Sequence, residues 1–444
     1  MIITAVKDHF RLRKNINIQP FDLPCLPARL SAIFYRQKLE VGLNILVFNC
    51  GSSSQHYKLY QTTGSGLNVL CKGKAHRVGV KSHEPSFIEH TYNNEVTRTT
   101  LPLQDHATAA NLTLNFLEEK QLPVDAIGHR FVHGGERFQQ SILLTPARLA
   151  ELTDVLPLAP IHNPNSMSVI QVCLQRLASK PETLTFDTAF HAGLPECAYR
   201  YALPASLVKR FALRKYGFHG LSYQYVSRQA ADFLHRPLES LRIVACHLGT
   251  GGSSVCAIQG GISIDTSMGY SPLAGLMMST RSGDLDPAVI LDMLCRGKSA
   301  AEISALLNKN SGLLGIAEFS SDIRDLIKAA DEEDNALARL AVDMYTSRLK
   351  KTIGSYLALL GGADALLFTD DIGMQNSAVR ELACSGLEWA GVNLDAVANS
   401  KAPLNRMSDI SRSDSRTRIL VTPTDEELVI ALETTRLLQE VTYG

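Results

Sequence analysis

The chain has 444 residues, 45% of them hydrophobic and 20% charged, so it can bury a large core and its length favours two or more domains. Basic and acidic residues balance at 44 each, which excludes a bulk charge that would attract nucleic acid or an anionic membrane, and we expect a small-molecule partner. Its nine cysteines lack the spacing of zinc ligands, so we expect the reduced thiols of a soluble, cytoplasmic protein.

Residues 1–43 differ in character from the rest of the chain. They contain three prolines and clustered basic side chains, with no clear hydrophobic period. They have neither the uninterrupted apolar stretch of a signal peptide nor the serine content of an organellar transit peptide. We interpret them as an N-terminal extension of uncertain order that the function does not need. No stretch approaches the roughly 20 apolar residues of a membrane span, so none is expected.

Two similar segments lie far apart in the chain, ILVFNCGSSS at 45–54 and RIVACHLGTGGSS at 242–254. In each, an apolar strand pattern runs into a loop of small residues and then into a second strand pattern. Such loops let backbone N–H groups approach an anion closely, because no Cβ stands in the way. The pair predicts a phosphate held between two related halves.

The remaining pattern is that of an α/β protein. Strand patterns at 45–49, 126–132, 184–187, 243–247 and 365–369 alternate with helical patterns, which predicts sheets covered by helices. The longest predicted helix begins near Asp334 and ends at Gly361. Residues 370–373 follow a buried strand, and we expect them in a loop at its carboxyl end, where ligands of open α/β sheets gather.

Arginine, histidine and aspartate recur in loops beside glycine or proline. Each alone is more often structural than functional, because such residues commonly bond the backbone of turns. Together with two phosphate loops they are the parts of a phosphoryl-transfer site, where positioning and charge stabilisation supply most of the catalysis. The positions are Arg130, His133, His162, Asp187, His191, His219, Arg281, Asp284 and Asp286.

At these residues the chain resembles the acetate and propionate kinases, a family of the actin-like ATPase superfamily that also holds sugar kinases and Hsp70 chaperones. Matching segments follow the family's order from residue 45 to about residue 435, among them ILVFNCGSSS, GHRFVHGGERF, PLAPIHNP, RKYGFHG, CHLGTGGS, STRSGDLDP and PTDEELVIALET. The resemblance implies two related actin-like (ribonuclease H-like) α/β domains with the active site in the cleft between them. Domain I would comprise 44–186 plus 426–444, and domain II 187–425.

The resemblance also implies an activity, reversible transfer of the ATP γ-phosphoryl group to acetate or propionate, with Mg²⁺, by a homodimer. The products are an acyl phosphate and ADP. An acceptor carboxylate is already ionised at neutral pH and needs no general base, but its charge must be brought to an anionic phosphate. Arginine suits this task because its planar fork bonds oxyanions at two points. A sugar kinase, the runner-up on fold alone, would need a carboxylate base for a neutral hydroxyl.

The resemblance assigns roles to individual residues. Arg130 and Arg281 would hold the carboxylate and the transferring phosphoryl group, His219 would stabilise transition-state charge, and Asp187 would orient the arginines or the metal shell. The implied acyl pocket is Val132, Ile161, Phe218 and Pro272. The implied metal positions are Asn49 and Glu426, although Glu426 in TDEE is equally typical of a helix first turn. Nucleotide and phosphate binding is implied at Ser52, Ser54, His56, His162, His247, Gly249, Thr250, Gly251, Asp322, Ile323, Arg324, Asp371, Ile372, Gly373 and Gln375.

Departures from the family pattern cluster on the donor side. Two carboxylates near a nucleotide repel its phosphates, bond a ribose or bind a cation. The donor therefore stays open between ATP, GTP and pyrophosphate, with a non-catalytic nucleotide or acyl-phosphate sensor as the further alternative. The departures are Asp370 and Asp371 for two glycines, Met374 and Gln375 for Glu-Asn, Thr250 for asparagine, His56 for lysine, and Leu221 and Tyr223 for threonine and histidine.

Overall fold

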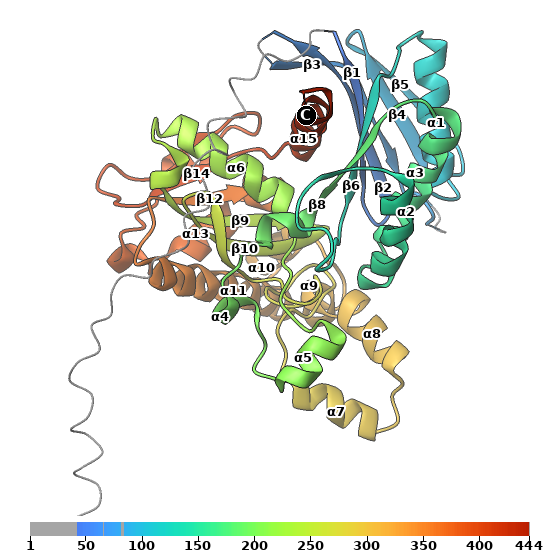
Figure 1. Ribbon diagram of the computed structural model, residues 1–444. Helices are drawn as coiled ribbons and strands as arrows, with labels where there is room; N and C mark the ends of the chain where they lie inside the picture. The colour runs from blue at the N-terminus through green and yellow to red at the C-terminus, as the bar shows by residue number, and fades with distance from the viewer. Residues whose placement is uncertain (1–41, 65, 81–83, 444) are drawn as a thin grey trace, which may run out of the picture. The chain divides into compact units, whose positions relative to one another are not determined.

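The computed structural model describes residues 42–64, 66–80 and 84–443 (Figure 1). The prediction of an N-terminal extension falls on residues 1–43, and of these 1–41 lie outside the described residues. Within the described ranges, no helix is both long enough and apolar enough to cross a membrane.

The first sheet has eight strands in the order β5-β4-β3-β2-β1-β6-β8-β7. Strands β1, β6 and β8 are parallel to one another, and β2 to β5 extend the sheet from β1 as an antiparallel meander. The bounds are β1 Asn44–Cys50, β2 Ser54–Thr63, β3 Gly66–His76, β4 Phe87–Tyr92, β5 Glu95–Thr100, β6 Ala126–Phe131, β7 Ile142–Leu143 and β8 Glu182–Phe186.

The second sheet has six strands in the order β11-β10-β9-β12-β14-β13. Here β9, β12 and β14 are parallel, and β10 and β11 extend the sheet from β9 as an antiparallel meander. The bounds are β9 Arg242–Gly249, β10 Gly252–Gln259, β11 Ile262–Thr266, β12 Ala365–Thr369, β13 Ser408–Asp409 and β14 Arg418–Val421.

The two sheets therefore share one topology, β3-β2-β1-β6-β8 in the first and β11-β10-β9-β12-β14 in the second. In both, a meander of three strands is followed by two strands parallel to the first. This repetition confirms the predicted fold class, two related α/β halves. The exact domain boundary at residue 187 stays a prediction.

Helices cover both faces of each sheet, which is why the central strands are apolar on both sides. In β1, Leu46 and Phe48 pack towards α1 (His106–Glu119) and α3 (Asn163–Arg176), while Ile45 and Val47 pack towards α15 (Glu426–Tyr443). The second sheet repeats this alternation between α11 (Ala336–Leu360) and α6 (Gly220–Phe233), and α6 contacts α15.

The predicted strands and the long helix are confirmed, but the loop predicted at 370–373 is wrong. The six-residue helix α12 (Asp370–Gln375) begins at the first residue after β12. A single residue makes the turn, because Asp370 adopts a left-handed backbone with φ +66°. The remaining helices are α2 Pro146–Leu152, α4 Glu196–Tyr199, α5 Ala205–Phe211, α7 Pro287–Cys295, α8 Ala300–Lys309, α9 Gly312–Ala317, α10 Ile323–Glu332, α13 Ser377–Cys384 and α14 Ala396–Ser400.

Candidate active site

A cavity of about 440 Å³ lies at the carboxyl ends of the parallel strands of both sheets. Parallel neighbours end at the same edge of a sheet, so residues that terminate them converge. The ends of β1, β6 and β8 bring together Asn49, Arg130 and Asp187. The lining is Asn49, Gly51, Ser52, Ser54, His56, Arg130, Val132, His162, Asp187, Phe218, His219, His247, Gly251, Gly252, Pro272, Arg281, Asp370, Thr424, Glu426 and Glu427.

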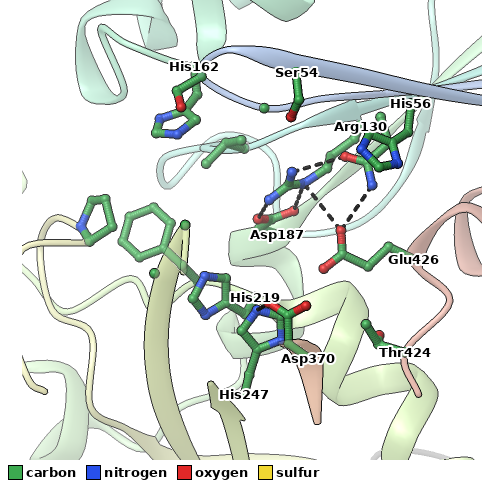
Figure 2. A pocket seen from close by; sticks show the side chains of 18 of the residues that line it. Ser54, His56, Arg130, His162, Asp187, His219, His247, Asp370, Thr424 and Glu426 are labelled. Carbon is green, nitrogen blue, oxygen red and sulfur yellow. Dashed lines mark hydrogen bonds and ion pairs between the residues drawn. The ribbon is translucent and has the colours of Figure 1, made fainter. Parts of the chain in front are cut away.

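Arg130 is held in a fixed orientation by acidic and amide oxygens (Figure 2). Its Nε and Nη2 donate to the two carboxylate oxygens of Asp187 at 2.8 and 2.5 Å, and its Nη1 donates to Asn49 Oδ1 at 3.0 Å. Burial alone lowers the pKa of Arg130, but the charges of Asp187 and then Glu426 outweigh it and raise that pKa. The guanidinium is therefore a permanent cation whose plane is set before any ligand arrives.

Arg281 differs because it contacts no carboxylate among the described residues. Its Nη1 donates to the carbonyl of Pro272 at 3.2 Å and approaches Met278 Sδ at 3.8 Å. Burial lowers its pKa, and no neighbouring charge raises it again. An arginine that lines a cavity without a counter-charge is suited to bind an anion there.

His219 and Arg281 converge on one spot of the cavity wall. A Cβ placed on Gly252 would lie 3.1 Å from Arg281 Nη1 and 3.6 Å from His219 Nε2. His219 is fixed from its other side, since its Nδ1 lies 2.8 Å from Ser254 Oγ. Burial, and then the nearby charge of His247, lower the pKa of His219 well below its ordinary value. His219 is thus a neutral imidazole held beside a cation.

His247 stacks on His219 with ring centroids 4.0 Å apart and faces Asp370 (Figure 2). Its Nε2 lies 3.0 Å from Asp370 Oδ2, and its Nδ1 lies 2.9 Å from Ser222 Oγ. Burial alone lowers the pKa of His247, but the charge of Asp370 and their hydrogen bond raise it overall. The pKa values of the two stacked rings therefore shift in opposite directions, downward at His219 and upward at His247.

Asn49 and Glu426, the predicted metal positions, lie together. Asn49 Nδ2 donates to Glu426 Oε2 at 3.1 Å and to Glu427 Oε1 at 2.8 Å. Among the described residues, Glu426 Oε1 receives no hydrogen bond. Mg²⁺ prefers oxygen ligands and commonly keeps several waters beside one or two carboxylates and the substrate's phosphates. Glu426 fits this requirement, and it also belongs to the first turn of α15, as its sequence context predicted.

The wall across from these charges is apolar. Val132 and Phe218 are 4% and 2% exposed and line the cavity with Pro272. Ala159, Met268 and Met278 pack behind Val132 and Phe218, so this wall is closed from outside. His162 lines the same cavity, and burial together with the charges of Arg130 and Arg281 lowers its pKa to about 4.

A second, smaller cavity of about 10 Å³ gathers much of the predicted nucleotide set. The Asp371 carboxylate is bonded within it, because it accepts from Thr250 N at 2.8 Å and from Thr250 Oγ1 at 2.7 Å. The volume suffices for about one water molecule. The lining is Thr250, Ile323, Arg324, Asp371, Ile372, Gln375 and Asn376.

Comparison with known proteins now decides the family. The family model described as "Acetokinase family" matches residues 44–432. The acetate kinase of Caldicellulosiruptor saccharolyticus is 44% identical over 406 residues, 90% of this chain and 100% of that protein. The structure is similar to that of Porphyromonas gingivalis acetate kinase, with a TM-score of 0.80 and 38% identity over 89% of this chain and 100% of the other. A Francisella tularensis propionate kinase gives 0.81 and 36% over the same shares.

The chain belongs to the acetokinase family. It is a carboxylate kinase, a phosphotransferase with a carboxyl group as acceptor. The resemblance noted in the sequence motifs is therefore confirmed, and the sensor alternative gives way to an enzyme.

The structure brings most predicted site residues of this kinase to one of the two cavities, but four lie outside both. Ile161 is 48% exposed on the surface. Asp322 pairs with Arg324 and caps α10, and the carbonyl of Gly373 accepts from the buried Arg380. Gly249 lies against the Asp370 carboxylate, which does line the cavity.

Some residues that line the kinase's main cavity escaped the sequence-based assignment. Gly51 and Gly252 belong to the two small-residue loops, so their place in those motifs was the available signal. Glu427 follows Glu426 in TDEE. Conversely, His191 and Asp286 from the loop set are structural, since His191 bonds Ser263 and the carbonyl of Phe218, and Asp286 caps α7. The missed lining residues are Gly51, Gly252, Asp370, Thr424 and Glu427.

Proposed function

We propose that this carboxylate kinase transfers the γ-phosphoryl group of ATP to acetate or propionate, reversibly, in the cavity of about 440 Å³. The observation that carries the proposal is Arg281, a half-buried cation without a counter-charge among the described residues, which lines the same cavity as the fixed Arg130 and a small apolar wall. Two arginines can hold the acceptor carboxylate and the donor's phosphate close together despite their like charge, and the reaction requires no base.

The roles follow from the contacts. Arg130, oriented by Asp187, binds the acceptor carboxylate, and Arg281 with His219 stabilises the transferring phosphoryl group. A neutral His219 donates a hydrogen bond from Nε2 without adding a charge, provided that Ser254 donates to its Nδ1. Burial, and then the charges of Arg130 and Arg281, lower the pKa of His162 to about 4, so it stays neutral where it lines the phosphate path.

The apolar wall sets the acyl size. Val132, Phe218 and Pro272 accommodate a methyl or ethyl group, and the packed residues behind the wall leave little room for a longer chain. One methylene is worth about 1–3 kcal/mol in such a pocket, so both short acids are substrates under this proposal and acetate against propionate is a matter of degree.

We propose Mg²⁺ as the cofactor. Glu426 would hold it, directly or through water, with Asn49 fixing the carboxylate from behind. Bound there, the ion would neutralise charge on the donor's phosphates. Burial raises the pKa of Glu426 despite the nearby Arg130, so a divalent cation also stabilises its ionised form.

A pyrophosphate donor is the second candidate, and one observation favours it. The cavity beside Thr250 has a volume of only about 10 Å³, and Asp371 already bonds the Thr250 N–H. A donor without a nucleoside needs no space there.

The experiment is acyl phosphate formation trapped as the hydroxamate, with acetate or propionate as acceptor and ATP, GTP or pyrophosphate as donor. The Arg281→Ala variant serves as the blank. Turnover with ATP that vanishes in the variant supports the proposal and ranks the acids. Turnover with only GTP or only pyrophosphate rejects ATP as donor, and turnover that persists in the variant rejects the role of Arg281.

We also propose that the kinase is a homodimer that uses α7. This nine-residue helix has no buried residue, and it exposes 43% of Val289, 61% of Leu291 and 43% of Leu294. Exposed apolar groups of this kind mark protein contacts. Light scattering should give twice the chain mass, and Leu291→Asp should shift it towards one chain; a monomeric wild type would exclude the dimer.

A further inference from the structure

His247 lines the cavity, yet both of its ring nitrogens are occupied within the protein. Nδ1 lies 2.9 Å from Ser222 Oγ, and Nε2 lies 3.0 Å from Asp370 Oδ2. An imidazole has only two nitrogen positions. While both contacts persist, His247 therefore has no N–H to offer a phosphate oxygen.

Asp370 reaches this position through an unusual backbone conformation. Its φ of +66° lies in the left-handed region, which non-glycine residues seldom adopt. The carboxylate is seated on the second small-residue loop, since a Cβ on Gly249 would lie 2.0 Å from Asp370 Oδ2. The side chain is 36% exposed and lines the cavity. A negatively charged oxygen thus occupies the space in which the loop would admit an anion.

Asp371 reinforces the same arrangement from the other side of the loop. It accepts the backbone N–H of Thr250, one of the groups through which a small-residue loop binds a phosphate. Two neighbouring carboxylates therefore hold two anion-binding groups, the Nε2 of His247 and the N–H of Thr250.

We propose that the Asp370 carboxylate is an internal competitor for the phosphates of the donor, which must displace it from His247 and Gly249, so that Asp370 sets the donor affinity of this kinase. The inference rests on the proposed function only in that the donor's phosphates reach the acceptor across this loop. It makes Asp370 a specificity-determining residue on the donor side and predicts no effect on the carboxylate acceptor.

The test compares Asp370→Asn and Asp370→Gly with the wild type. Asparagine keeps the size and removes the charge, and glycine also relieves the left-handed backbone. Removing a like charge beside the donor's phosphates should lower the KM of the Mg²⁺–donor complex about tenfold in both variants. The KM of acetate should stay within about twofold, because the acceptor side is untouched. Asp331→Asn is the matched control, since that carboxylate is 67% exposed on α10 and, in the part of the chain that the structure describes, pairs with Arg339 alone, at 3.8 Å.

A merely structural role for Asp370 would move both KM values or the melting temperature instead of the donor KM alone. An unchanged donor KM overturns the proposal. A raised donor KM with a higher Mg²⁺ requirement also overturns it, because the carboxylate would then bind the donor's cation. If the wild type uses pyrophosphate instead of ATP, the proposed donor fails, but the same comparison made with pyrophosphate still tests Asp370.

Discussion

The acceptor side of the cavity and the donor loop are made from equivalent elements, the carboxyl ends of three parallel strands in each sheet. Their charges are used differently. On the acceptor side Asp187 orients Arg130, which stays a cation, and Arg281, from the loop between β11 and α7, has no counter-charge among the described residues, whereas on the donor loop Asp370 and Asp371 already bond His247 and Thr250. A family motif therefore locates a side chain in a site, but the partner of that side chain decides whether it is ready for a ligand.

The acceptor side should be the more sensitive to loss of a single charge. Asp187→Asn removes the carboxylate that holds both Nε and Nη2 of Arg130, so the guanidinium should turn towards Glu426, 4.0 Å away. We expect kcat/KM for acetate to fall about 10²- to 10³-fold, the scale of losing one preorganised electrostatic contact. Steady-state kinetics with varied acetate measures it.

Glu182→Gln is the matched control for that variant. Glu182 lies on β8 and pairs with His129 at 2.8 Å, with both side chains 2% exposed, next to Arg130 on β6 but outside the cavity. Weakening this buried hydrogen bond should reduce the free energy of unfolding by about 1–3 kcal/mol while kcat/KM of the folded protein stays unchanged. Equal losses of activity in both variants would contradict a specific role for Asp187.

Gly252 pairs with Gly249 of the donor loop and lies beside Arg281 and His219. Its substitution should have the next largest effect. The Cβ in Gly252→Ala lies 3.1 Å from Arg281 Nη1, so the flexible arginine end must move away from His219. We expect kcat to fall by several-fold, up to about tenfold, because the guanidinium must shift by a few tenths of an ångström, and a misplacement of about 1 Å costs about 100-fold. Gly354→Ala in α11 is the control, since nothing lies within 4 Å of its new Cβ, and it should leave kcat unchanged and stabilise the helix by about 1 kcal/mol.

On the donor loop, the pair of Thr250 and Asp371 should contribute less. The contact is at the surface, so a double-mutant cycle of Thr250→Ala and Asp371→Ala on the melting temperature should give a coupling energy of about 0.5–1 kcal/mol. Additive effects of the two substitutions would mean that the loop does not depend on this contact. The Thr250 N–H would then be as open to an anion as the acceptor side is.

The sequence predicted the framework of this comparison well, for a physical reason. Strands β1 and β9 are buried on both faces and read as unbroken apolar runs, so the strand pattern predicted them, while the resemblance to the family assigned Asn49, Arg130 and His247 at the strand ends to the site. The similar loops after both strands predicted two related halves, which the shared sheet topology confirms.

What the sequence could not predict is how side chains pair across the fold. Asp370 was expected in a loop, and its contact with His247 depends on its own left-handed backbone at the first position of α12, directly after β12. Ile161 was assigned to the acyl wall from its motif alone, but the first turn of α3 begins two residues later and leaves it 48% exposed. Both cases turn on local backbone geometry, which motif spacing does not encode.

The smallest effect, on titration, separates the two sides most directly. Burial and the charges of Arg130 and Arg281 lower the pKa of His162, on the acceptor side, to about 4. His162 should therefore stay neutral from about pH 5.5, which is about one and a half units above that pKa, to about pH 9. His247 on the donor side faces Asp370, Glu426, Arg130 and His219, and Asp370 raises its pKa above the ordinary 6.5. Because the folded-state pKa is raised, the ion pair is complete at low pH and is lost as the pH rises through that value. Nuclear magnetic resonance of the histidine rings should show His247 titrating above 6.5 in the wild type and below it in Asp370→Asn, since burial alone lowers the pKa. A His247 midpoint that does not move would mean that Asp370 is not its partner in solution, and the two sides of the cavity would then be equally open to anions.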